Sequence, residues 1–85
     1  YYFRILTRQG ASAAGGAYSY VINGRMIAGF AMVAYPSEYG ESGVMTFVVS
    51  HNGKVYEKDL GKGSTVIGAK MTTFDPGAGW KEVPR

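Results

Sequence analysis

The chain has 85 residues, enough for one domain, and a chain of this length buries only about 60–65% of the surface that it exposes when unfolded. Hydrophobic residues make up 46% of it and the net charge is +3, a composition too apolar for a disordered chain. The nine basic residues form no cluster, so we expect no nucleic-acid partner, and the absence of cysteine excludes disulfide bonds and thiolate metal ligands.

The N-terminal part of the chain predicts two strands separated by a loop. Apolar residues alternate along residues 2–7, as in a half-buried strand. Residues 9–16 are small and show no periodicity, which indicates a loop. Residues 17–22 form the next predicted strand, and the pair Asn23-Gly24 after it favours a type I′ hairpin turn, because both positions tolerate a positive φ.

Nine apolar residues in a row, residues 26–34, mark a central strand that we place at residues 25–35. A strand with one exposed face would alternate polar and apolar side chains, so this strand is predicted to be buried on both faces. Gly29 and Ala31 leave a shallow trough on one face, where a tyrosine ring of the preceding strand can lie over the glycine. We expect an interface or packing role for six residues around this trough: Ile27, Gly29, Ala31, Val33, Tyr18 and Tyr20.

A polar loop follows the central strand and is the candidate ligand site. Loops of this kind often carry binding residues, and paired carboxylates are typical of a weak calcium site or an acid pair, although a solvated loop is the favoured interpretation. The residues that would contact a ligand are Tyr35, Glu38, Tyr39 and Glu41.

A second hairpin joins predicted strands at residues 44–50 and 54–60 through another Asn-Gly pair, for which we again expect a type I′ turn. That turn places Val49 opposite Tyr56, on an apolar face that also carries Phe47. The opposite face, which we expect to be wet, carries Val44, Thr46, Val48 and Ser50.

The C-terminal part predicts one short helix. Ser64 is a candidate N-cap for a helix over residues 65–73, residues 74–77 read as a turn, and Trp80 is the last large apolar residue that can pack back. Together these elements predict a β-rich α+β fold, an antiparallel meander of about four to five strands with a short C-terminal helix, in a single domain over residues 1–85.

The residues that could carry chemistry are too few and too scattered for catalysis. His51 is the only histidine and lies beside a predicted turn, so neither a zinc site nor a serine triad is expected. We therefore predict no enzyme activity, no catalytic or metal-binding residue and no cofactor.

Several stretches, in this order, resemble the C-terminal part of the bacterial family catalogued as domain of unknown function 2950. They are Tyr1-Tyr-Phe-Arg-Ile-Leu-Thr-Arg-Gln-Gly10, Gly15-Gly-Ala-Tyr18, Val21-Ile-Asn-Gly-Arg-Met-Ile27, Ser42-Gly-Val-Met-Thr-Phe-Val-Val49, Asn52-Gly-Lys-Val-Tyr-Glu-Lys-Asp-Leu-Gly61 and Phe74-Asp-Pro76. The resemblance covers nearly the whole chain. It implies an exported protein, extracellular or periplasmic, of which this chain is a fragment or processed part, and it implies no activity.

A weaker likeness points to a role in assembly. Residues 2–3, 30–34, 43–47 and 53–56, with Pro36, are similar to the C-terminal sheet of type IV pilins and pseudopilins, where the sheet packs on a long N-terminal helix. The likeness implies a headgroup-like fold whose trough receives a helix from a missing N-terminal region or from another chain.

We therefore expect a structural or assembly module that forms a homo-oligomer or filament at the cell surface without itself spanning the membrane. The alternative is a secreted ligand-binding domain that recognises a saccharide or a cell-envelope polymer through the loop after the central strand.

Overall fold

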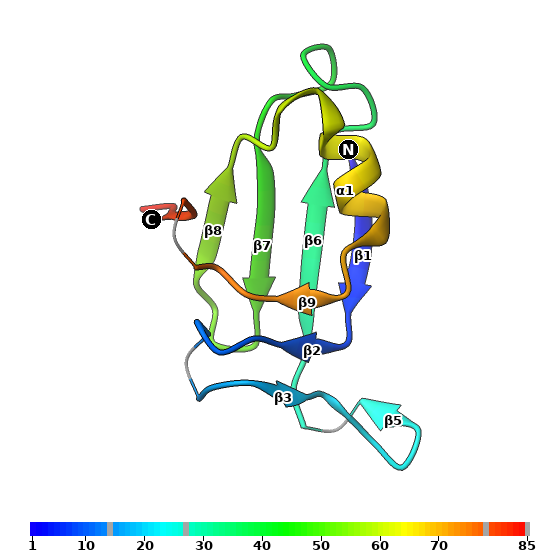
Figure 1. Ribbon diagram of the computed structural model, residues 1–85, viewed down its shortest axis with the longest axis vertical. Coiled ribbons are helices and arrows are strands. Elements are labelled where there is room, and N and C mark those ends of the chain that lie inside the picture. Colours follow the sequence, from blue (N-terminus) through cyan, green and yellow to red (C-terminus); the bar gives the residue numbers. More distant parts are fainter. Residues whose placement is uncertain (14, 27, 78, 85) are drawn as a thin grey trace.

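The computed structural model describes residues 1–13, 15–26, 28–77 and 79–84 (Figure 1). Its main element is a five-stranded antiparallel sheet with the strand order β1-β6-β7-β8-β10. The strands are β1 (Tyr2–Leu6), β6 (Ala31–Tyr35), β7 (Thr46–Ser50), β8 (Val55–Lys58) and β10 (Lys81–Glu82). The predicted fold class, a sheet-rich chain with an antiparallel sheet and one short helix near the C-terminus, is confirmed.

A second layer lies across one face of this sheet (Figure 1). It contains helix α1 (Ser64–Lys70), which follows the 3₁₀ turn η1 (Gly61–Gly63), and a small sheet in which β2 (Arg8–Gln9) lies between β3 (Tyr18–Ser19) and β9 (Thr73–Phe74). A separate hairpin pairs β4 (Val21–Ile22) with β5 (Arg25–Met26). We call the face of the large sheet that this layer covers the inner face, and the opposite one the outer face.

The core lies between the inner face and the second layer. Its buried apolar residues come from β1, β6 and β7 on one side and from Tyr20 and Phe74 on the other. They are Leu6, Ala13, Tyr20, Ala31, Val33, Tyr35, Val48 and Phe74. Helix α1 approaches the sheet closely because it presents Gly68 to Tyr35, where a Cβ atom would overlap the tyrosine ring.

The first hairpin forms as predicted near its turn and differs beyond it. Asn23 has φ 51° and Gly24 φ 79°, as a type I′ turn requires, and Val21 lies opposite Met26. Further along, the prediction of one continuous strand over residues 25–35 is wrong, because the strand is interrupted between β5 and β6. The backbone of Tyr20 turns inward and donates a 2.8 Å hydrogen bond to the carbonyl of Thr7, so that β3 pairs with β2 instead.

The second hairpin differs from its predicted register by one residue. Val48, not Val49, lies opposite Tyr56. The cause is the turn: Gly53 has φ 82°, but Asn52 is not left-handed, so the turn is not type I′. A shift of one residue moves every side chain of a strand to the other face of the sheet. Thr46 and its alternate neighbours therefore point inward, and the predicted wet face is the buried one.

The helix is shorter than predicted and is capped differently. It spans Ser64–Lys70, and Ser64 lies inside it with a fully buried side chain that makes no capping hydrogen bond. Residues 73–74 form β9, which places Phe74 in the core rather than in a turn. Trp80 packs against the core as expected, and β10 follows it as a strand that the sequence pattern did not predict.

Candidate functional site

The outer face of the large sheet carries two rows of mostly apolar side chains. Residues directly opposite each other on antiparallel strands project on the same side of a sheet. One row runs through Phe3, Ala34, Phe47 and Glu57, and the next runs through Ile5, Met32, Val49 and Val55. Tyr1 and Phe30 extend the same alternation just before β1 and β6, and their rings contact Phe47 and His51. The apolar residues of the outer face are Tyr1, Phe3, Ile5, Phe30, Met32, Phe47, Val49 and Val55.

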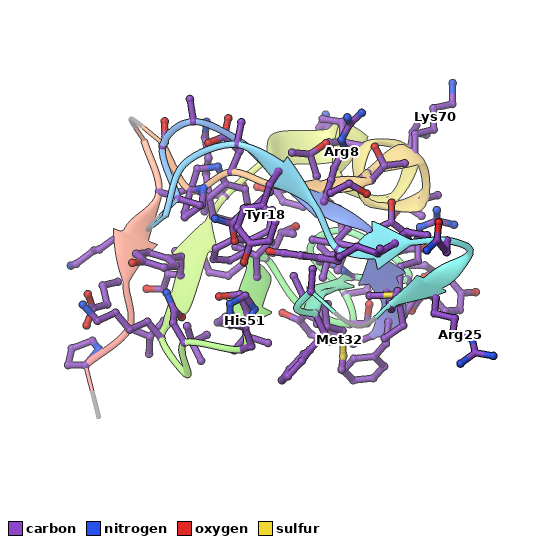
Figure 2. The ribbon with its side chains drawn as sticks, turned by 90° about the horizontal axis from the view of Figure 1, so that it is seen from below. Arg8, Tyr18, Arg25, Met32, His51 and Lys70 are labelled. Atoms are coloured by element: carbon purple, nitrogen blue, oxygen red, sulfur yellow. The ribbon has the colours of Figure 1, made fainter. Side chains whose placement is uncertain are left out.

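The outer face is open to solvent. Phe3 is 68% exposed, Phe30 56% and Ile5 55%. Figure 2 shows Met32 on the side of the sheet opposite Arg8 and Lys70, which lie with the second layer. At about 200 Å² for an aromatic side chain, Phe3 and Phe30 alone expose on the order of 250 Å². With their neighbours they reach the size of the largest apolar patch on a typical monomer, which is often a functional surface.

Strand β7 places two polar side chains on the buried inner face. Thr46 is 0% exposed and Ser50 3%, and both point into the core from β7 together with Val48, while Phe47 and Val49 point outward. The hydroxyls of Thr46 and Ser64 are buried and have no hydrogen-bond partner among the described residues. A sheet with one face in water normally turns its polar residues to that face. The distribution in β7 is therefore typical of a strand whose outer face is covered by something else.

The predicted trough is filled from within the chain. A Cβ atom at Gly29 would lie 2.7 Å from Cε1 of His51 and 2.9 Å from Cδ1 of Tyr20, so the glycine is required by the rings packed on it. Ala31 and Val33 are both 0% exposed. The expectation that a helix from outside the chain would lie in this trough is wrong, because these side chains leave no surface to contact. The surface that remains open is the outer face.

The two predicted tyrosines of the trough lie together with the lone histidine. The rings of Tyr18 and Tyr20 meet edge to face, with centroids 5.5 Å apart. The hydroxyl of Tyr20 donates a 3.0 Å hydrogen bond to Oε1 of the buried Gln9, and burial raises the pKa of Tyr20, with a smaller contribution from Tyr18. Ile27, the remaining predicted residue of this group, lies outside the described residues.

His51 joins the ends of two strands. Its Nε2 lies 3.3 Å from the hydroxyl of Tyr18, as Figure 2 lets the reader follow, and its Nδ1 lies 3.3 Å from both the amide nitrogen and the carbonyl oxygen of Phe30. The backbone amide of His51 also donates to that carbonyl, at 3.0 Å. These contacts hold the turn after β7 against the entrance to β6, which is the structural role expected of a single turn histidine.

The predicted ligand loop does not bring its residues together. Tyr35 is only 6% exposed and packs under α1, away from the loop. The carbonyl of Glu38 accepts hydrogen bonds from Ser42 and from the amide of Glu41, so the loop closes on itself, with the carboxylates in exposed residues.

Tyr39 is held by a neighbouring carboxylate. Its hydroxyl donates a 2.7 Å hydrogen bond to Oδ1 of Asp59, which also accepts from the amide of Gly61 at 2.9 Å. The bond to Asp59 raises the pKa of Tyr39, and the same bond, with that of Gly61, lowers the pKa of Asp59. Because the polar group of Tyr39 is already used, the loop offers a ligand fewer free groups than the sequence suggested.

Metal sites, pockets and membrane-spanning helices are all absent from the part of the chain that the structure describes. It contains no group of three or more histidine, aspartate or glutamate residues placed to hold a metal ion, and no pocket. None of its helices has the length and hydrophobicity to cross a bilayer.

Comparisons with known proteins identify the family and no characterised relative. No curated protein and no solved structure matches the chain. The model of one family, described as "Protein of unknown function (DUF2950)", matches residues 1–83. Since this match covers almost the entire length, the chain belongs to the DUF2950 family.

Proposed function

We propose that this domain is an assembly module of an exported protein, and that a neighbouring copy covers its outer face in the assembly. The observation that carries the proposal is the distribution of polarity in β7, where Thr46 and Ser50 are buried while Phe47 and Val49 face outward. In a monomer this arrangement leaves apolar area in water while polar groups are desolvated, and both effects are unfavourable.

Packing of one outer face on another would bury its apolar side chains. Two sheets stack about 10 Å apart when their side chains interdigitate. Full burial of an exposed aromatic or aliphatic side chain contributes about 1.5–3 kcal/mol, and association costs about 4–15 kcal/mol in lost freedom of motion. Because the aliphatic residues of β6, β7 and β8 are already half-buried, the net gain is small. We expect a weak contact, with a dissociation constant in the micromolar to millimolar range.

The location and the form of the assembly belong to the same proposal. The resemblance of the sequence to an exported family supports an extracellular or periplasmic location, and the likeness to pilin sheets supports a filament. A non-enzymatic role is supported by the use of His51 in structural contacts with Tyr18 and Phe30.

Substitution of outer-face valines by threonine tests this contact while preserving the fold. Thr retains the β-branched shape of Val, but each hydroxyl buried at the interface costs about 1–3 kcal/mol. The double variant Val49→Thr/Val55→Thr introduces four such hydroxyls into a symmetric dimer, so we expect association through the outer face to weaken at least about a thousandfold. Sedimentation equilibrium from micromolar to millimolar concentration measures this.

The matched control is Val21→Thr/Val66→Thr, two exposed valines that lie away from the outer face. It should associate like the unmodified chain. A chain that remains monomeric throughout the concentration range, or two double variants that associate equally well, would overturn the proposal.

A further inference from the structure

The two edges of the large sheet differ in how they are protected. Strand β1 is one edge, and it pairs with β6 and with no other described strand (Figure 1). The other edge, β10, has two residues, Lys81 and Glu82, both charged and exposed, with Pro84 shortly after. Short length, charge and proline are the features by which natural sheets prevent an edge from pairing with another chain.

Strand β1 is less protected, with Arg4 as its one charged residue. Its five residues pair with β6 without a bulge, from Tyr2 opposite Tyr35 to Leu6 opposite Ala31. It contains no proline or lysine, and its first four residues are exposed. An edge strand presents a row of backbone amide and carbonyl groups without partners, and the chemistry that satisfies such a row is another extended strand.

We propose that β1 pairs antiparallel with β1 of a second copy, about a two-fold axis at Phe3, to give one continuous ten-stranded sheet. This deepens the proposed function by naming a second contact between copies, made by the sheet edge instead of the outer face. Joining the sheets in this way also joins their two outer faces into one apolar surface.

The side chains select the register. Directly opposite residues share a face, so both outer faces lie on the same side only if the axis passes through a residue and not between two residues. The three residues at the middle of β1 are Phe3, Arg4 and Ile5. An axis at Arg4 places each arginine opposite its copy, which is repulsive. An axis at Ile5 requires pairing at Thr7, where the chain has already left β1 and its amide is bonded to the carbonyl of Thr72.

An axis at Phe3 avoids both problems and forms three favourable kinds of pair. Phe3 lies opposite its own copy, Tyr1 opposite Ile5, and Tyr2 opposite Arg4. Aromatic pairs and aromatic pairs with β-branched residues stabilise neighbouring strands, and an arginine beside a tyrosine ring adds a cation–π contact.

The absence of native cysteine makes the register directly testable. In the Phe3→Cys variant the two cysteines would face each other across the axis, with Cα atoms about 4.5–5.5 Å apart, which suits a disulfide bond. Under mild oxidation of the 85-residue chain we expect a disulfide-linked dimer to form at least about tenfold faster than for Val66→Cys, an exposed control on α1. Arg4→Cys should cross-link more slowly than Phe3→Cys.

The same measurement in the Val49→Thr/Val55→Thr background separates the two contacts. Cross-linking through Phe3→Cys should persist there, since those valines lie on β7 and β8 and not at the edge. Cross-linking no faster than that of Val66→Cys in both backgrounds would overturn edge pairing and leave the outer-face proposal standing. Faster cross-linking of Arg4→Cys would overturn the register, and loss of cross-linking only in the valine variant would assign the contact to the outer face.

Discussion

The buried hydroxyl groups of this chain differ in whether they form hydrogen bonds. Thr46 and Ser64 are both fully buried without a hydrogen-bond partner among the described residues, whereas the hydroxyl of Thr65 donates a 2.8 Å bond to the carbonyl of Pro36. A buried polar group without a partner is unfavourable, while one that is bonded contributes to stability. Neighbouring residues of the same kind therefore have opposite effects on the fold.

This difference predicts that two substitutions change the free energy of unfolding in opposite directions. Thr46→Val keeps the shape of the side chain and removes an unsatisfied hydroxyl, so we expect the free energy of unfolding to rise by about 1 kcal/mol. Thr65→Val removes the donor to Pro36 and should lower it by about 1 kcal/mol. Urea denaturation followed by circular dichroism measures both, and a destabilised Thr46→Val variant would show that the hydroxyl has a role in the fold.

The bond between Tyr39 and Asp59 predicts a pH dependence with two limits. The lowered pKa of Asp59 means that its contribution to stability is present above its ordinary value of 3.8 and is lost as the pH falls through the lower folded value. The raised pKa of Tyr39 means that its contribution is present below 10.0 and is lost as the pH rises through the higher folded value. The stability difference between the unmodified chain and Tyr39→Phe should thus be largest at intermediate pH.

Thermal denaturation across the pH range measures that difference. Tyr2→Phe is the control, because Tyr2 is exposed and its hydroxyl makes no described hydrogen bond, and it should change stability equally little at every pH. A Tyr39→Phe difference that stays constant across the range would mean that the bond to Asp59 does not form in solution.

At the scale of the elements, the two Asn-Gly hairpins show what a sequence pattern can and cannot determine. The dipeptide is the same, yet Asn23 is left-handed and Asn52 is not. Beside the second turn, His51 is bonded through its backbone and its ring to Phe30 at the entrance to β6. These contacts extend the pairing of β6 and β7 beyond Ser50, and the turn then closes through a 2.9 Å hydrogen bond from the amide of Gly53 to the carbonyl of Ser50. Such contacts are not visible in the dipeptide, because Phe30 lies 21 residues away from His51 along the chain.

The consequence of that turn explains why the fold class could be predicted and the site could not. The number of strands, the antiparallel order and the short helix follow from periodicity and turn residues near each element. Which face of β7 is buried depends on a register set by one residue in the turn, and a one-residue error exchanges the faces. The face of β7 with Phe47 and Val49 was therefore expected to be the apolar, buried one, and the trough at Gly29 was expected to be open.

At the scale of the whole molecule, the edge and the outer face are two different surfaces, each of which pairs with its own copy. A molecule with one such two-fold contact forms a closed dimer, whereas two contacts with different axes link dimers into a larger assembly. The likeness to pilin sheets and the two proposed contacts thus lead to the same expectation, an assembly that grows beyond two copies.

Variants that remove one contact at a time test this expectation. Tyr2→Lys places a lysine opposite Arg4 of the second copy on the inner side of the joined sheets, so it should prevent edge pairing without touching the outer face. We expect Tyr2→Lys and Val49→Thr/Val55→Thr each to stop at dimers, their combination to be monomeric, and the unmodified chain to exceed the mass of a dimer at millimolar concentration. Sedimentation velocity distinguishes these species. If either variant alone already gives a monomer, one contact carries all the association, and the domain is a dimerisation module rather than a building block of a filament.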